Sequence, residues 1–125
     1  MSPALAIAVE RNESARKDAL QQLVNELRQA SQKLKQADRF SVQSAEFGEL
    51  IQYSQRLLEM SDVQMASLLK VARPTIGRWS RGESTPARLM ASAVLLTIAD
   101  EARERIKRVQ KSAQRVLEGE LEAVA

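Results

Sequence analysis

The sequence predicts an all-α protein, and three observations lead to that fold class. Two long segments, residues 12–37 and 87–118, contain no glycine or proline, and their apolar residues recur at intervals of three and four, as on one face of a helix. Between them, Ser61, Pro74 and Gly82 mark the ends of two short helices. With 125 residues, 44% of them hydrophobic and 3% aromatic, the chain is long enough for one core. We therefore expect a single small helical domain with helical extensions.

Cysteine and histidine are both absent from the sequence. Their absence removes disulfides, thiol nucleophiles, imidazole bases and the usual zinc ligands. We therefore expect no catalytic residue, no metal site and no cofactor. The first ten residues are apolar but too short to span a bilayer, and they lack the basic residues that precede a secretory core. We expect a cytoplasmic protein that has no membrane partner.

The sequence divides into five predicted parts. A flexible tail over residues 1–11 precedes an amphipathic helix over residues 12–40, which serves packing or dimerisation. After a break near residues 40–44, residues 45–98 form the central helical domain. A C-terminal helical extension over residues 99–118 again serves packing or dimerisation, and residues 119–125 form a frayed tail. The apolar residues that precede the extension are expected to be buried: Leu89, Met90, Val94, Leu95 and Ile98.

The second short helix, from Arg73 to Gly82, has one apolar and one cationic face. At roughly 100° per residue, its first face carries Ala72, Ile76 and Trp79, and its second carries Pro74, Arg78 and Arg81. The net charge of +3 is mild, but no acidic residue occurs from Val63 to Gly82, where four basic residues fall: Lys70, Arg73, Arg78 and Arg81. This clustering predicts a local positive field and a polyanionic partner.

The stretch from Ser61 to Gly82 resembles, along its whole length, the helix-turn-helix of the Xre/Cro-like (phage lambda repressor-like) DNA-binding family. Ala66 stands where the family keeps a small residue at a helix crossing, and Val71 takes the apolar turn position. The pairs Thr75–Ile76, Arg78–Trp79 and Arg81–Gly82 follow the family's spacing. The resemblance implies a lambda-repressor-like helix-turn-helix domain with long N- and C-terminal helical extensions.

Three positions depart from the family pattern. Lys70 stands at the turn position that is usually Gly, and a left-handed conformation costs Lys more than Gly. Asp62 stands where a phosphate-contacting Gln is common, and Ala72 replaces the frequent Ser or Thr cap. Ser61 itself is expected to cap the first short helix.

The resemblance implies that the second short helix enters the major groove of double-stranded DNA. Arg73, Thr75 and Arg78 match positions that contact bases or the adjacent backbone in the family, and Arg78 is the main candidate for guanine. Pro74 is also expected at the DNA interface, where it offers only an apolar edge. Gly77 is expected to allow a close approach to DNA, and Trp79 to pack in the core with Ile76. Phosphate contacts are expected from Arg81, Ser61, Gln64 and Lys70.

Two thin apolar stripes, one near each end of the chain, predict a homodimer. They comprise Leu20, Leu23, Leu27 and Leu34 in the first helix and Ile106, Val109 and Val116 in the extension. We expect these stripes to pack together and to help form the dimer. A twofold dimer places two recognition helices roughly 34 Å apart and favours an inverted-repeat operator. The same stripes also fit antiparallel packing inside one subunit.

The predicted function is that of a sequence-specific transcription regulator, most simply a homodimeric repressor. Within the same resemblance, the protein also fits the antitoxin of a toxin–antitoxin pair, and copurification of a small toxin would favour that alternative. A third hypothesis is an assembly adaptor, in which the helical ends bind a protein and the helix-turn-helix is only a scaffold. An enzyme is the least favoured hypothesis. Ser67 and Lys70 could be drawn as a catalytic Ser–Lys pair, but no feature of the sequence buries the lysine.

Overall fold

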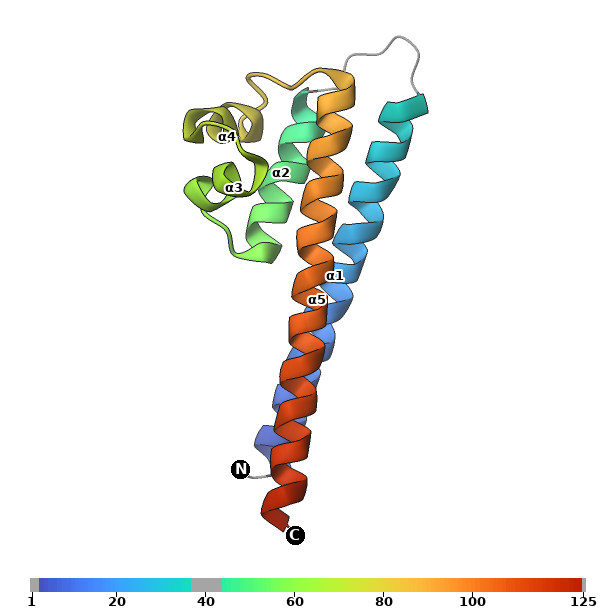
Figure 1. The fold of residues 1–125 in the computed structure, drawn as a ribbon, viewed down its shortest axis with the longest axis vertical. Helices are drawn as coiled ribbons and strands as arrows, with labels where there is room; N and C mark the ends of the chain where they lie inside the picture. The colour runs from blue at the N-terminus through green and yellow to red at the C-terminus, as the bar shows by residue number, and fades with distance from the viewer. Residues whose placement is uncertain (1–2, 37–43, 125) are drawn as a thin grey trace.

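Two long antiparallel helices run the length of the molecule (Figure 1). They are α1, Pro3–Gln36, and α5, Arg88–Val124. Three shorter helices lie together on one side of this pair: α2, Ser44–Leu58, α3, Asp62–Leu69, and α4, Arg73–Ser80. The computed structural model describes residues 3–36 and 44–124, and these residues form helices and no strand. The predicted all-α class is therefore confirmed.

Both predicted tails are helical over the residues that the structure describes. Helix α1 begins at Pro3, because proline suits the first helical turn and the alanines that follow favour a helix. Helix α5 continues through Gly119 to Val124. Gly119 has no positive φ, and its cost in a helix, roughly 1 kcal/mol, is too small to end α5 there. The break predicted near residues 40–44 falls largely on residues 37–43, outside the described residues.

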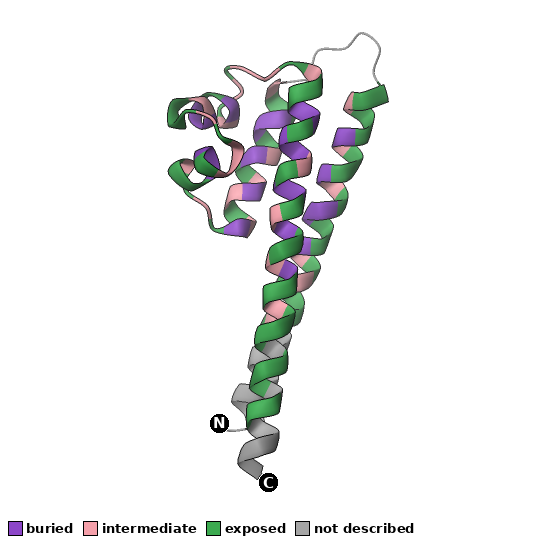
Figure 2. Ribbon diagram, viewed as in Figure 1, coloured by how far each residue is buried: buried purple, intermediate pink, exposed green. Residues whose placement is uncertain are grey.

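The hydrophobic core lies where the three short helices pack against α1 and α5. Buried residues gather in this half of the molecule, whereas in the other half most of the α5 residues whose burial is described are exposed (Figure 2). The largest buried side chains come from all five helices and include Leu23, Leu27, Phe47, Ile51, Met65, Ile76, Leu95 and Ile98. The core therefore fixes α3 and α4 against the two long helices.

In this half, polar contacts join the C-terminal end of α1 to the N-terminal end of α5. The buried hydroxyls of Ser31 and Ser92 are hydrogen-bonded at 2.6 Å. The Nη1 atom of Arg88 donates to the carbonyl oxygens of Leu34 and Lys35, at 2.7 and 3.2 Å. These carbonyls belong to the last turn of α1 and have no partner within the helix, so Arg88 caps α1 from α5.

The two predicted dimerisation stripes pack together, but they do so inside one subunit. Leu20, Leu23 and Leu27 of α1 and Ile106 of α5 are buried in the core of the single chain. Leu34 and Val109 are partly buried against the same core, and Val116 is exposed. The prediction that these buried residues form a contact between subunits is therefore wrong. They are already covered by the antiparallel contact between α1 and α5.

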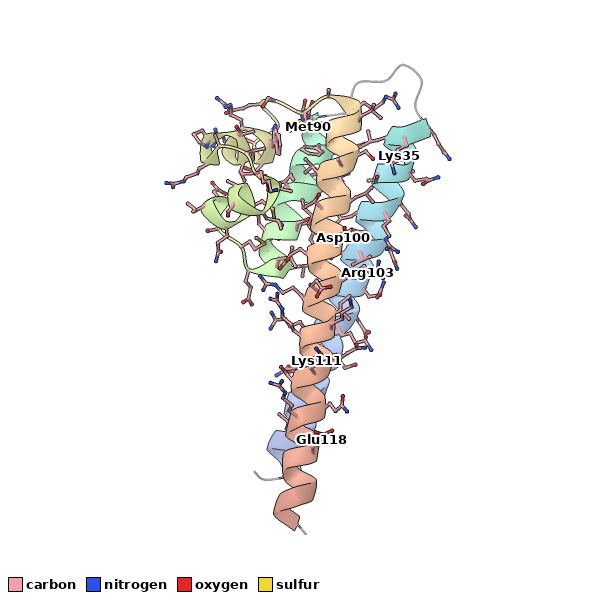
Figure 3. The ribbon with its side chains drawn as sticks, in the orientation of Figure 1. Lys35, Met90, Asp100, Arg103, Lys111 and Glu118 are labelled. Atoms are coloured by element: carbon pink, nitrogen blue, oxygen red, sulfur yellow. The ribbon has the colours of Figure 1, made fainter. Side chains whose placement is uncertain are left out.

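The prediction that Leu89 and Met90 are buried is also wrong. Their exposed fractions are 65% and 46%, whereas Val94, Leu95 and Ile98 are buried as predicted. Arg88 and Ser92 of the same helix face α1, and residues one and two positions after Arg88 are rotated away at roughly 100° per residue. Farther along α5, the outer face is charged and carries Asp100, Arg103, Lys111 and Glu118 (Figure 3).

Candidate nucleic-acid interface

The start of α3 is fixed by a reciprocal cap. The Ser61 hydroxyl accepts a hydrogen bond from the Gln64 backbone N–H at 3.2 Å, and the Gln64 Oε1 atom accepts one from the Ser61 N–H at 2.9 Å. This is a capping box, and it confirms the predicted cap at Ser61. Both side chains were predicted to contact phosphate; both are exposed, and each already takes part in the cap.

The turn between α3 and α4 contains a left-handed lysine. Lys70 has φ 57° and ψ 45°, and the Val71 N–H donates to the Ala66 carbonyl at 3.0 Å. The turn therefore adopts the left-handed conformation although this residue is not glycine. The Lys70 side chain is exposed beside α4, where a phosphate contact was predicted. Ala66 is buried, as a close crossing of α3 and α4 requires.

The inner face of α4 is anchored by an aromatic pair and by a close backbone approach. Trp79 is 4% exposed, and its ring meets that of Phe47 edge to face, with 5.6 Å between centroids. A Cβ atom at Gly48 of α2 would lie 2.6 Å from the Trp79 carbonyl oxygen. The Gln52 amide of α2 also donates to the Ser80 carbonyl. The position of Trp79 in the core was predicted from the sequence, whereas the contacts of Gly48 and Gln52 with α4 were not.

The outer face of α4 lines a shallow hollow of about 460 Å³. The predicted DNA-binding residues that it brings together are Arg73, Pro74, Arg78 and Arg81, with Gly77 between them. Arg73 and Arg78 are exposed, and neither forms an ion pair within the described ranges. Thr75 is half-buried and lies outside this hollow, as do Ser61, Gln64 and Lys70.

Two carboxylates share this hollow with the arginines, and the sequence analysis gave them no role there. Asp62 precedes the stretch that lacks acidic residues and Glu83 follows it, yet both line the hollow. Asp62 Oδ1 accepts a hydrogen bond from Gln55 Nε2 at 2.8 Å. The local positive field is therefore weaker than the sequence suggests, because three guanidinium groups face two carboxylates.

Glu83 is brought back against α4 by the way this helix ends. Gly82 has φ 72°, its N–H donates to the Trp79 carbonyl at 3.0 Å, and the Glu83 N–H donates to the Arg78 carbonyl at 2.9 Å. These two bonds form a Schellman motif, which returns the residue after the glycine toward the last helical turn. An Arg-Gly-Glu sequence at a helix end is the signal that could have predicted this placement.

Glu83 forms an ion pair with Arg81. Arg81 Nε lies 2.9 Å from Glu83 Oε1, and Arg81 Nη2 lies 3.2 Å from Glu83 Oε2. The hydrogen bond from Arg81 lowers the pKa of Glu83 below its ordinary value of 4.5, and the same bond raises the pKa of Arg81. Arg81, predicted to contact phosphate, therefore already has an anionic partner in the free protein.

Comparison with known protein families, with curated proteins and with solved structures found no match. None of the helices in the described ranges combines the length and the apolar character needed to cross a bilayer. The function of this surface is therefore inferred from its own residues.

Proposed function

We propose that the protein is a cytoplasmic, sequence-specific regulator of transcription that binds double-stranded DNA through α4. In this proposal α3, the turn and α4 are a lambda-repressor-like helix-turn-helix, and the protein is most simply a homodimeric repressor at an inverted-repeat operator. The observation that carries the proposal is the two-sided character of α4. Ile76 and Trp79 are buried on one side, and Arg73 and Arg78 are exposed on the other.

The proposed contacts follow from this arrangement. The major groove of DNA accepts an α-helix, and an exposed arginine can bond both acceptors of a guanine. Arg78 is the leading candidate for this contact, and Arg73 and Thr75 approach bases or the adjacent backbone. We expect phosphate contacts, which fix the orientation of the protein, from Lys70 and from Ser61 and Gln64 at the start of α3, all of which are exposed.

The dimer is proposed because a single recognition helix contacts too short a DNA sequence. A single helix contacts only a few base pairs, so a lone small domain binds too weakly to compete with other genomic sequences. Beyond the core, the described residues of α5 are mostly exposed and offer surface to a second subunit (Figures 1 and 2). Val116 in this part of α5 is the exposed apolar residue of the predicted interface.

Selection from random DNA duplexes by the purified protein, at a stated salt concentration, tests the proposal. We expect an inverted repeat, and we expect Arg78→Glu to abolish its recognition, because one bidentate guanine contact alone contributes about 10- to 100-fold to specificity. The matched control is Arg103→Glu, which makes the same charge change on the outer face of α5 (Figure 3). This control should retain the selected sequence.

Two results would contradict the proposal. One is that the wild-type protein selects no sequence, and the other is that Arg78→Glu selects the same sequence with unchanged affinity. A protein partner that remains bound to the Arg73→Glu/Arg78→Glu double variant, in the absence of any DNA binding by the wild type, would favour the assembly adaptor.

A further inference from the structure

Arg81 lies back along the outer face of α4. A Cβ atom at Gly77, four residues earlier, would lie 3.0 Å from Arg81 Nη1 and 3.7 Å from both Cζ and Nη2. The missing side chain at Gly77 therefore leaves room for the guanidinium group. Gly77 was predicted to allow a close approach to DNA, but in the structure the neighbouring space holds Arg81.

Glu83 holds the guanidinium group in this place. Its two oxygens accept hydrogen bonds from Nε and Nη2 of Arg81, at 2.9 and 3.2 Å. Glu83 is itself fixed to the helix, because its N–H donates to the Arg78 carbonyl at 2.9 Å. A bidentate pair restricts an arginine more than a single bond does. The Glu83 carboxylate is ionised at neutral pH, and the hydrogen bond from Arg81 lowers its pKa further below the ordinary value.

The ion pair leaves one edge of the guanidinium group available. Arginine has five N–H donors in a fixed plane, and Glu83 accepts from one on Nε and one on Nη2. Both donors on Nη1 and the second donor on Nη2 remain, and one of the Nη1 donors is parallel to the remaining Nη2 donor. The Arg81 side chain as a whole is 60% exposed, and of its two terminal nitrogens Nη2 lies farther from Gly77 than Nη1 does. A parallel pair of N–H donors matches the O6 and N7 acceptors of guanine.

We propose that Arg81 is a second guanine-recognising side chain on α4, and that Gly77 and Glu83 are its positioning residues. This inference rests on the proposed function. It replaces the phosphate contact expected for Arg81, because a carboxylate bound to the guanidinium group repels a phosphate but does not block the uncharged edge of a base. The sequence recognised by each subunit then contains one guanine for Arg78 and another for Arg81.

Binding to single-base-pair variants of the selected site tests this assignment. Arg81→Lys keeps the charge but removes the planar fork, so the preference for guanine at one position should fall about 10- to 100-fold while other positions stay unchanged. Glu83→Gln and Gly77→Ala should weaken the preference at that same position. Glu83→Gln should also strengthen binding to unrelated DNA, because it removes a negative charge.

The matched control for Glu83→Gln is Glu104→Gln. Glu104 pairs with Lys107 at 3.1 Å on the exposed side of α5, so this variant also removes the carboxylate of a surface ion pair. It should leave every base preference unchanged. Thermal unfolding of each variant, followed by circular dichroism, checks that the binding changes do not come from loss of the fold.

The alternative is that Arg81 contacts phosphate and Glu83 merely competes with it. In that case Arg81→Ala lowers the steepness of the salt dependence by about one and leaves all base preferences intact. Glu83→Gln then strengthens binding to every sequence equally. Either result overturns the inference while the proposed function stands. If the wild-type protein selects no sequence, the proposed function fails and this inference fails with it.

Discussion

The two faces of α4 are built on different physical principles. The inner face depends on volume and close approach: the Trp79 ring packs edge to face on Phe47, and Gly48 lets α2 reach the end of α4. The outer face depends on charge, and its arginine and glutamate side chains are exposed. Substitutions should therefore change stability on the inner face and binding on the outer face.

The largest expected effect is that of Trp79→Ala on the inner face. Removing a buried tryptophan leaves a cavity and should lower the free energy of unfolding by about 3 to 5 kcal/mol. That is a large fraction of the stability of a small domain, about 5 to 15 kcal/mol. Urea denaturation followed by circular dichroism measures the change. Arg78→Ala on the opposite face is the control, and it should shift stability by about 0.5 kcal/mol or less. If both variants lost the same free energy of unfolding, the conclusion that only the inner face determines stability would be refuted.

Gly48→Ala should have the next largest effect on stability. The added Cβ atom would lie 2.6 Å from the Trp79 carbonyl oxygen, and this oxygen belongs to the backbone of α4, so a helix must move. Overpacking of this kind lowers stability by about 1 to 3 kcal/mol, although alanine favours a helix more than glycine does. The same denaturation experiment measures the loss. A Gly48→Ala variant as stable as the wild type would show that α2 and α4 are not held this closely.

The inner face could be predicted from the sequence because it follows local rules. The helical period placed Ile76 and Trp79 together, a serine and a glycine marked the ends of α3 and α4, and all of these positions agree with the structure. The close approach at Gly48 could not be predicted, because it depends on how α2 and α4 cross. The same is true of Leu89, whose exposure depends on the rotation of α5 about its axis.

The outer face could be predicted only in part. Its arginines follow from the period, but its charge balance depends on Asp62 and Glu83, which lie just outside the stretch without acidic residues. Asp62 reaches the hollow from the start of α3, and Glu83 reaches it because the chain turns back at Gly82. Counting charges along the sequence does not reveal the role of Asp62 and Glu83. These residues come close to the arginines only when the start of α3 and the end of α4 are folded.

Gly77→Ala should have the smallest effect on stability, and its sign should be opposite to that of Gly48→Ala. Alanine gains up to about 1 kcal/mol over glycine inside a helix. The atoms nearest the new Cβ would all belong to Arg81, with Nη1 at 3.0 Å, and the solvent-exposed ion pair with Glu83 that holds this side chain contributes little to stability, so shifting it costs little. Denaturation should therefore show equal or greater stability, while the preference for guanine at one operator position falls. A clear loss of stability would mean that the outer face is packed like the inner one, and a stabilised variant with unchanged base preference would mean that the position of Arg81 over Gly77 has no part in recognition.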